Sequence, residues 1–147
     1  MFSASRFSEV ELHFNKGLAG SPSEAIEAAK DTPMNPSVCG AFALAIVADG
    51  QDPAYPGVSN HEPDTAKGRA AADAVHCCMN ELRAVASRGG AYVAESNFFE
   101  SDFQRSYWGT NHPRLVQIKK KYDPDGLFFV HHGVGSEQWT PDGFTRL

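Results

Sequence analysis

Residues 119–137 read KKKYDPDGLFFVHHGVGSE, and this stretch contains three structural signals in succession. The three lysines are typical of the last turn of a helix, where they complement the negative end of the helix dipole. The Asp-Pro-Asp-Gly sequence that follows predicts a turn. The apolar residues 127–131 then predict a last strand, on which His131 and His132 would point to opposite faces and could not bind one metal ion together. We therefore expect a helix, a turn and a strand here, and no metal site.

The rest of the chain alternates between helical and extended patterns. Helices are predicted at 21–30, with Ser21 as cap and Glu24 completing a capping box, and from Asp64 or Thr65 to about Ser87. A third helix is predicted from a capping Asn111 to Lys121, after an aromatic segment 96–110 with a helical turn or two. Strands are predicted at 38–48 and 91–95. A loop with three prolines, 49–63, is long enough to be functional or mobile.

Bulk composition limits the classes of partner. The chain has 147 residues, which most simply form one domain, 1–147, ending in a tail, 140–147. The net charge of −5 argues against a nucleic-acid partner, because binding phosphates needs a basic face. No apolar run approaches the roughly 20 residues of a membrane span, and no signal peptide is visible. Three cysteines cannot pair fully, so we expect a reducing, cytoplasmic compartment and no disulfide framework.

The run 91–139 contains the motifs YVAESN, YWGTNHPRL, KKKYDPDGLF and HHGVGSEQW. It resembles the C-terminal, substrate-domain end of fungal berberine-bridge-enzyme-like FAD-linked oxidases, in the vanillyl-alcohol-oxidase superfamily. Upstream, TPMNPSVCGAFALAI and SASRF also resemble this group. The chain departs from it at His112, where the family commonly has Tyr, and near Ala94, where it often has Asn.

The resemblance implies an antiparallel sheet with helices packed on one face. We therefore predict an α+β fold rather than the parallel α/β sheet that alternation alone suggests. The family holds FAD through a Gly-rich pyrophosphate loop in a separate N-terminal domain, and no GxGxxG motif occurs here. We therefore expect no cofactor. The sheet face turned toward the flavin in the family would be exposed and apolar, which predicts a homodimer.

Several side chains are candidates for a site, each with a structural alternative. Glu95, Tyr107 and His112 are the predicted catalytic groups. Glu95 could instead pair with Arg105 or Arg114, and His112 could be a first-turn surface residue. The predicted substrate-binding residues are aromatic or imidazole side chains, which could equally be core packing or exposed loop positions: Phe42, Tyr55, Tyr92, Phe98, Trp108 and His132.

The leading functional hypothesis is a flavin-independent cyclase or isomerase of fungal natural-product biosynthesis. It would confine an apolar polycyclic or polyene substrate for a cyclisation such as an intramolecular Diels–Alder reaction. One alternative is the C-terminal subunit or fragment of a split FAD-linked oxidoreductase. The other is a non-catalytic small-molecule binding protein.

Overall fold

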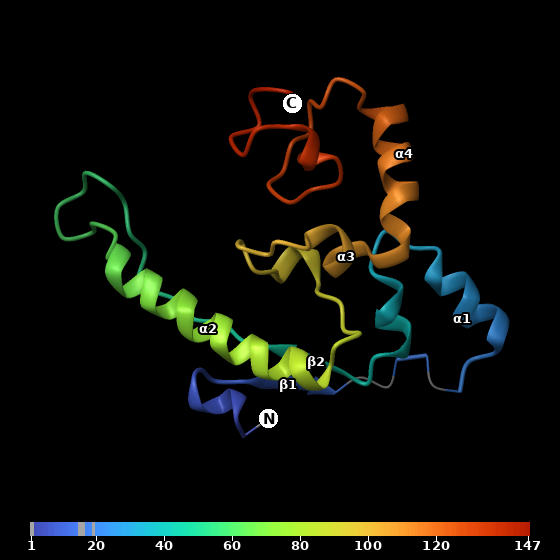
Figure 1. Ribbon diagram of the computed structural model, residues 1–147, viewed down its shortest axis with the longest axis horizontal. Helices are drawn as coiled ribbons and strands as arrows, with labels where there is room; N and C mark the ends of the chain where they lie inside the picture. The colour runs from blue at the N-terminus through green and yellow to red at the C-terminus, as the bar shows by residue number, and fades with distance from the viewer. Residues whose placement is uncertain (1, 15–16, 19) are drawn as a thin grey trace. The chain divides into compact units, whose positions relative to one another are not determined.

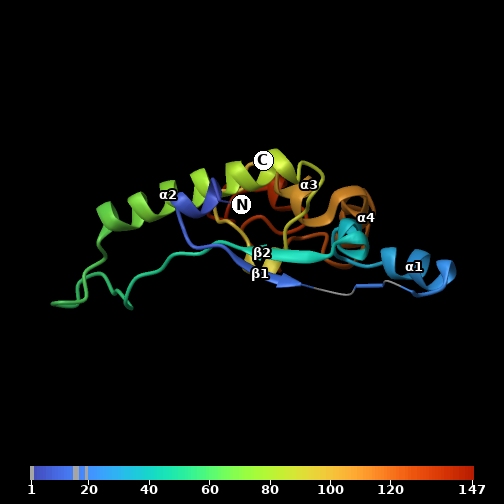
Figure 2. The ribbon, with the colours of Figure 1, turned by 90° about the horizontal axis from the view of Figure 1, so that it is seen from below.

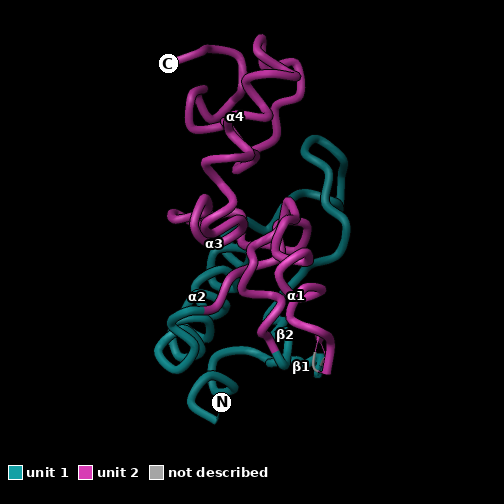
Figure 3. The backbone as a smooth tube through the Cα atoms, turned by 90° about the vertical axis from the view of Figure 1, so that its right-hand side faces the viewer, with its two compact units in different colours: residues 1–15, 42–88 teal, residues 16–41, 89–147 magenta. Residues whose placement is uncertain are grey.

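The computed structural model describes residues 2–14, 17–18 and 20–147, and these residues divide into two compact units. Unit 1 comprises Met1–Asn15 and Phe42–Arg88, and unit 2 comprises Lys16–Ala41 and Gly89–Leu147 (Figure 3). Each unit is described by itself below.

Unit 1 consists of a two-stranded antiparallel sheet and one long helix (Figure 1). Strand β1 (Glu11–Phe14) pairs with β2 (Ala43–Ile46), so that Leu12 lies opposite Ala45. Helix α2 (Thr65–Val85) lies along one side of the sheet (Figure 2). It begins where predicted, with Asp64 at the N-cap, and the Asp64 carboxylate accepts a hydrogen bond from the Lys67 N–H at 2.9 Å.

The core of unit 1 is small. Ala4, Cys78 and Leu82 are buried, and Val10, Val47 and Met79 pack against them. Cys78 and Leu82 are four residues apart on α2, so one face of the helix carries both. Burial raises the pKa of the Cys78 thiol, as expected for a cysteine that acts as a small core residue.

Unit 2 contains three short helices joined by irregular segments. They are α1 (Ser23–Lys30), α3 (Phe103–Trp108) and α4 (His112–Tyr122). The chain bends between α3 and α4 at Gly109, which has a positive φ of 51°. The buried residues of this unit include Phe103, Tyr107 and Trp108, with Ala91, Leu115 and Val134 packed around them.

The predicted α+β class with an antiparallel sheet is confirmed, but several local predictions are wrong. Ser21 does not cap α1, whose N-cap position is Pro22. Of the strand predicted at 38–48 only β2, Ala43–Ile46, is extended. The residues before it form a 3₁₀ turn, Pro36–Gly40, whose N-cap Asn35 accepts from the Ser37 N–H. β1 was not predicted at all.

The other two strand predictions also fail, for a visible reason. In 91–95 the Glu95 N–H donates to the Tyr92 carbonyl and closes a 3₁₀ turn. In 127–131 the Asp123 carboxylate accepts from the N–H groups of Leu127 and Phe128, at 2.8 and 3.1 Å. Side chains and local turns therefore use backbone groups that a strand would need for its ladder.

No helix among the described residues is both long and apolar enough to cross a bilayer.

Candidate functional site

Seven rings of unit 2 form one cluster, which we call the imidazole–aromatic cluster. Helix α3 contributes three of its rings, and α4 contributes one in its first turn. The remaining three come from the segment before α3 and from the turn after Val130. The cluster consists of Phe98, Phe103, Tyr107, Trp108, His112, His131 and His132.

Helix α3 builds the buried half of this cluster. Phe103 and Tyr107 are separated by four residues and therefore share a helix face, with ring centroids 6.3 Å apart. Trp108 is perpendicular to both, at 6.2 Å from Phe103 and 5.6 Å from Tyr107, which is the edge-to-face geometry that aromatic rings prefer. The Tyr107 hydroxyl donates to the Asn97 carbonyl at 3.1 Å and so ties the preceding segment to the helix.

Four of the rings stack in sequence. Phe98 lies against His131 at 4.3 Å with an angle of 20° between the ring planes. His131 lies 3.8 Å from His132, and His132 lies 4.6 Å from Phe103 at an angle of 11°. The prediction that the two histidines point to opposite faces is therefore wrong. The residues form a turn rather than a strand, and a turn brings the two rings together.

His132, in the middle of this stack, has an unusual backbone conformation and a lowered imidazole pKa. Its φ is +57°, in the left-handed region that non-glycine residues seldom occupy. Burial lowers the pKa of its imidazole, the neighbouring His131 lowers it further, and Glu100 acts in the opposite direction. The neutral ring is therefore favoured, and a neutral ring packs against Phe103 without the cost of burying a charge.

Glu100 is a buried acid near this stack, and the sequence analysis did not identify it. Only 7% of the residue is exposed. Its carboxylate accepts from the Ser106 hydroxyl at 3.5 Å and from the Asp102 N–H at 3.3 Å, just before α3. Its sequence position could have identified it, because it follows two aromatic residues and precedes the first turn of a helix. An acid at such a position is well placed to accept hydrogen bonds from backbone N–H groups.

His112 and Glu137 form a second polar contact of the cluster. The His112 ring is 5.5 Å from Trp108, with 25° between the planes, and its Nε2 lies 3.8 Å from a Glu137 carboxylate oxygen. The same Nε2 is buried without a hydrogen-bond partner in the described part of the chain. His112 is thus half of a loose imidazole–carboxylate pair, and not an exposed first-turn residue.

The structure does not bring all nine predicted site residues together. Tyr107, Trp108, Phe98, His112 and His132 lie in the cluster. Glu95 and Tyr92 are in the same unit but exposed, on the 3₁₀ turn Val93–Glu95 and at its N-cap.

The two predicted site residues of unit 1 are also exposed. The Phe42 ring is 6.3 Å from Phe14, next to strand β2. The Tyr55 ring is 6.3 Å from His61 in the long loop, and the Tyr55 N–H donates to the His61 carbonyl at 2.6 Å.

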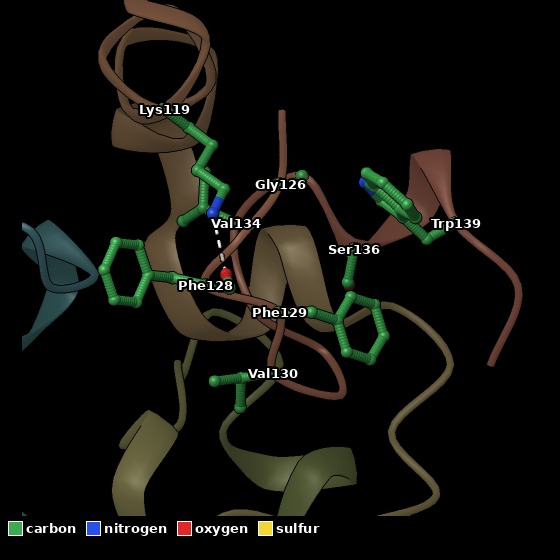
Figure 4. A pocket seen from close by; sticks show the side chains of 9 residues that line it. Lys119, Gly126, Phe128, Phe129, Val130, Val134, Ser136 and Trp139 are labelled. Carbon is green, nitrogen blue, oxygen red and sulfur yellow. Dashed lines mark hydrogen bonds between the residues drawn. The ribbon is translucent and has the colours of Figure 1, made fainter. Parts of the chain in front are cut away.

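Two hollows lie beside the C-terminal end of α4, and neither is lined by the residues of the cluster. One, of about 190 Å³, is bordered by Phe128, Phe129, Val130 and Trp139, and the Lys119 ammonium donates across it to the Phe128 carbonyl at 2.7 Å (Figure 4). The other, of about 320 Å³, has Lys120, Asp123 and Arg146 on its rim. Both volumes include space open to solvent.

Chemically, the cluster offers ring faces, two neighbouring imidazoles and two carboxylates, Glu100 and Glu137. Such a set can bind flat apolar molecules and hold or pass a proton. Among the described residues, no three His, Cys, Asp or Glu side chains are placed to bind a metal ion.

Comparison with known proteins places this cluster in a recognisable segment. Residues 91–135 match the family model described as Berberine and berberine like. An uncharacterized FAD-linked oxidoreductase of Arthroderma benhamiae is 48% identical over 65 residues, which is 44% of this chain and 11% of that protein. The VAO-type flavoprotein oxidase VAO615 of Thermothelomyces thermophilus is 40% identical over 86 residues, or 58% of this chain and 14% of the oxidase.

The FAD-linked oxidoreductase easE of Arthroderma otae is 60% identical over 47 residues, which cover 32% of this chain and 8% of that protein. No solved structure matches the chain. The predicted resemblance to berberine-bridge-like FAD-linked oxidases is thus confirmed over part of the chain. The matched region spans about a tenth of the length of these relatives.

The residues present do not fit an FAD on their own. A drug-sized ligand, smaller than FAD, occupies a pocket of about 300–1,000 Å³ that encloses most of its surface. The two hollows of unit 2 enclose only about 10 and 20 Å³, and the rest of their volume is open to solvent. Neither hollow by itself can therefore enclose a flavin.

Proposed function

We propose that this chain, whose residues 91–135 form a berberine-like segment, provides the C-terminal, substrate-side part of an FAD-linked oxidoreductase. A flavin-binding part, on the same or another polypeptide, would complete the enzyme. The chain's own contribution is then a wall of rings and titratable groups, not the flavin site itself.

One observation carries this proposal: the matched segment has a defined buried cluster and yet leaves large apolar side chains in water. Leu127, Phe128 and Val130 are each at least 67% exposed, although all three lie inside the matched residues. Exposed apolar side chains that gather in one segment commonly mark a surface covered by a partner. A flavin-binding part of the same kind of enzyme is the partner that the homology supports.

Within such an enzyme, the chain's residues would bind and orient the substrate. The ring faces of the cluster would exclude water, and the His112–Glu137 pair would hold or move a proton at Nε2. An imidazole nitrogen close to a carboxylate can pass a proton to or from a substrate, which is how such pairs serve as acids and bases.

The test is reconstitution with a flavin-binding domain. The chain is co-expressed with the VAO615 oxidase from which the matching C-terminal segment has been deleted, and the complex is isolated through a tag on this chain. We expect a yellow complex with close to one flavin per pair, and a colourless chain when it is expressed alone. A flavin-loaded chain without the partner, or no complex at all, would count against the proposal.

Matched variants sharpen this experiment. Phe128→Asp changes an exposed ring inside the matched segment, and we expect it to abolish the complex. Phe144→Asp changes a ring that is at least as exposed but lies outside that segment, and we expect the yellow complex to survive. Equal effects of the two substitutions would show that the complex does not depend on the matched surface.

The flavin-independent cyclase and the non-catalytic binding protein stay predictions. Both need a site that encloses an apolar molecule, and the two hollows described above enclose little. The homodimer also stays a prediction, and light scattering of the purified chain measures it directly.

A further inference from the structure

The stack of four rings in unit 2 ends at an aromatic corner that faces water. Phe98 is the outermost ring, and Phe99 stands beside it at 5.3 Å and nearly perpendicular, with 83° between the planes. The two residues remain 65% and 68% exposed. The inner end of the same stack is Phe103, which is buried.

This corner is held in place by hydrogen bonds. The Asn97 side-chain oxygen accepts from the Phe99 N–H at 3.0 Å, and the Asn97 carbonyl accepts from the Tyr107 hydroxyl at 3.1 Å. His131 Nε2 is 3.1 Å from the Phe98 carbonyl oxygen and stacks on the Phe98 ring. The backbone that carries the two exposed rings is thus held by polar contacts, and the Phe98 ring also stacks on His131. A preorganised surface loses little entropy when it binds a ligand.

The size and chemistry of the corner favour a small ligand. Two aromatic side chains, each about two-thirds exposed, offer on the order of 300 Å². A stable protein interface needs roughly 800 Å² per partner. The Phe98 carbonyl is already in contact with His131, so recognition here depends on ring faces rather than on backbone pairing. A flat conjugated molecule makes the best contact with such rings, by stacking on one and meeting the edge or face of the other.

We infer that Phe98 and Phe99 form a binding subsite for a planar aromatic or conjugated small molecule, on which a ring of the substrate continues the stack Phe98–His131–His132–Phe103. As a substrate subsite, this inference rests on the proposed function and names the substrate class. His132 has a left-handed backbone conformation, and in this conformation its ring lies between those of His131 and Phe103.

Binding is tested on the full chain alone, without any flavin partner. The probe is 2-naphthol, and the matched non-planar probe is its saturated analogue 2-decalol. Binding is followed by ligand-observed NMR titration. We expect 2-naphthol to bind at least fivefold more tightly than 2-decalol. We expect Phe98→Leu, which keeps an apolar side chain but removes the ring, to weaken 2-naphthol about tenfold.

The control for these variants is Phe144→Ala, which removes an exposed ring elsewhere in unit 2 and should leave binding unchanged. Because Phe98 is exposed, the folded state should survive its substitution, and circular dichroism verifies this. Equal affinity for the two probes, full binding by Phe98→Leu, or no binding of 2-naphthol up to its solubility limit would overturn the inference. If 2-naphthol binds but no yellow complex forms with the flavin-binding domain, the proposed oxidase function fails and the binding subsite stands. If the yellow complex forms but 2-naphthol does not bind, the subsite fails and the proposed function stands.

Discussion

Unit 1 and unit 2 are stabilised by different kinds of contact. In unit 1 the buried side chains Cys78 and Leu82 come from a long regular helix, whose face and cap are visible in the sequence. In unit 2 the core is made of Phe103, Tyr107 and Trp108 on a helix of only six residues. A helix that short is not stable by itself, so its surroundings must hold it in place.

Side-chain amides provide much of that support. The Asn35 amide donates to the carbonyls of Arg105 and Ser106, at 3.0 and 2.9 Å, at the end of α3. The Asn111 amide contacts the carbonyls of Lys30, Thr32 and Met34, at 3.1, 2.8 and 3.0 Å. Unit 1 thus depends on the apolar face of one long helix. Unit 2 depends on packed aromatic rings and on hydrogen bonds from a few polar side chains.

The largest effect is expected from removing the main ring of the unit 2 core. Trp108 is buried and perpendicular to both Phe103 and Tyr107. We expect Trp108→Ala to cost about 3–5 kcal/mol in the free energy of unfolding, because it leaves a large cavity. Hydrogen exchange should show the loss at α3 and at the first turn of α4.

The comparison for this variant is Leu82→Ala in unit 1, with an expected cost of about 2–5 kcal/mol. Its exchange change should appear in α2 and in the 3₁₀ turn Ala4–Arg6, which pack together. If both variants lose protection over the same residues, the two units do not have separate cores.

The second effect concerns the Asn111 amide. Asn111→Ala removes the amide that contacts these three carbonyls, one of them partly buried, and an unsatisfied buried acceptor costs about 1–3 kcal/mol. We therefore expect a lower urea midpoint and faster exchange near residues 30–34. Asn80→Ala, at an exposed position of α2, is the matched control. It should be neutral or slightly stabilising, because Ala has the higher helix propensity. An equal loss in both variants would contradict the role given to the Asn111 amide.

These amide contacts also explain which parts of the fold were predictable. Helices α2, α3 and α4 were expected because their signals are local: caps, a proline in the first turn and apolar spacing. Asn111 was expected to cap α4, but its side chain reaches carbonyls about 80 residues away in sequence, and no local pattern contains that information. The strand predicted at 127–131 failed for the same kind of reason, since Asp123 and Lys119 bind its backbone groups.

The site was predictable in its residue types and less so in its arrangement. Tyr107, Trp108, His112 and His132 were identified, and they do meet in one cluster. Glu100 and Phe103 were missed, because burial of an acid beside a histidine stack is a property of the tertiary fold. Glu95 and Tyr92 were expected on a strand, and the turn that forms there leaves both exposed.

A smaller effect is expected at the cap of α2. Asp64→Ala removes the acceptor for the Lys67 N–H and should cost about 1 kcal/mol. Asp64→Asn should retain most of the stability, because an amide oxygen also caps a helix. Helicity and the urea midpoint measure both. If Asp64→Ala changes neither, α2 is held by its packed face alone and the contrast with unit 2 becomes sharper.

The smallest effect on stability at neutral pH is expected at Asp123. This residue lies in unit 2, and its contribution to stability depends on pH. The hydrogen bond from Lys119 lowers the pKa of this carboxyl group, and the Phe128 and Leu127 N–H groups act in the same direction. Its stabilising contribution is therefore complete above the unfolded-state pKa of about 3.9, and it is lost as the pH falls through the lower folded-state pKa. Asp123→Asn keeps an oxygen acceptor but removes the charge, so it should flatten the acid side of the stability curve.

The measurement is the urea midpoint between pH 2 and 6, together with the exchange rates of the Leu127 and Phe128 amides. Asp125→Asn is the control in the same turn, because Asp125 accepts no hydrogen bond from the residues that the structure describes. The wild-type and Asp123→Asn curves should converge at the acid end, whereas Asp125→Asn should follow the wild type throughout. If Asp123→Asn also follows the wild type, the carboxylate does not hold segment 127–131. The absence of a strand there would then need another cause, such as the packing of the histidine stack that follows it.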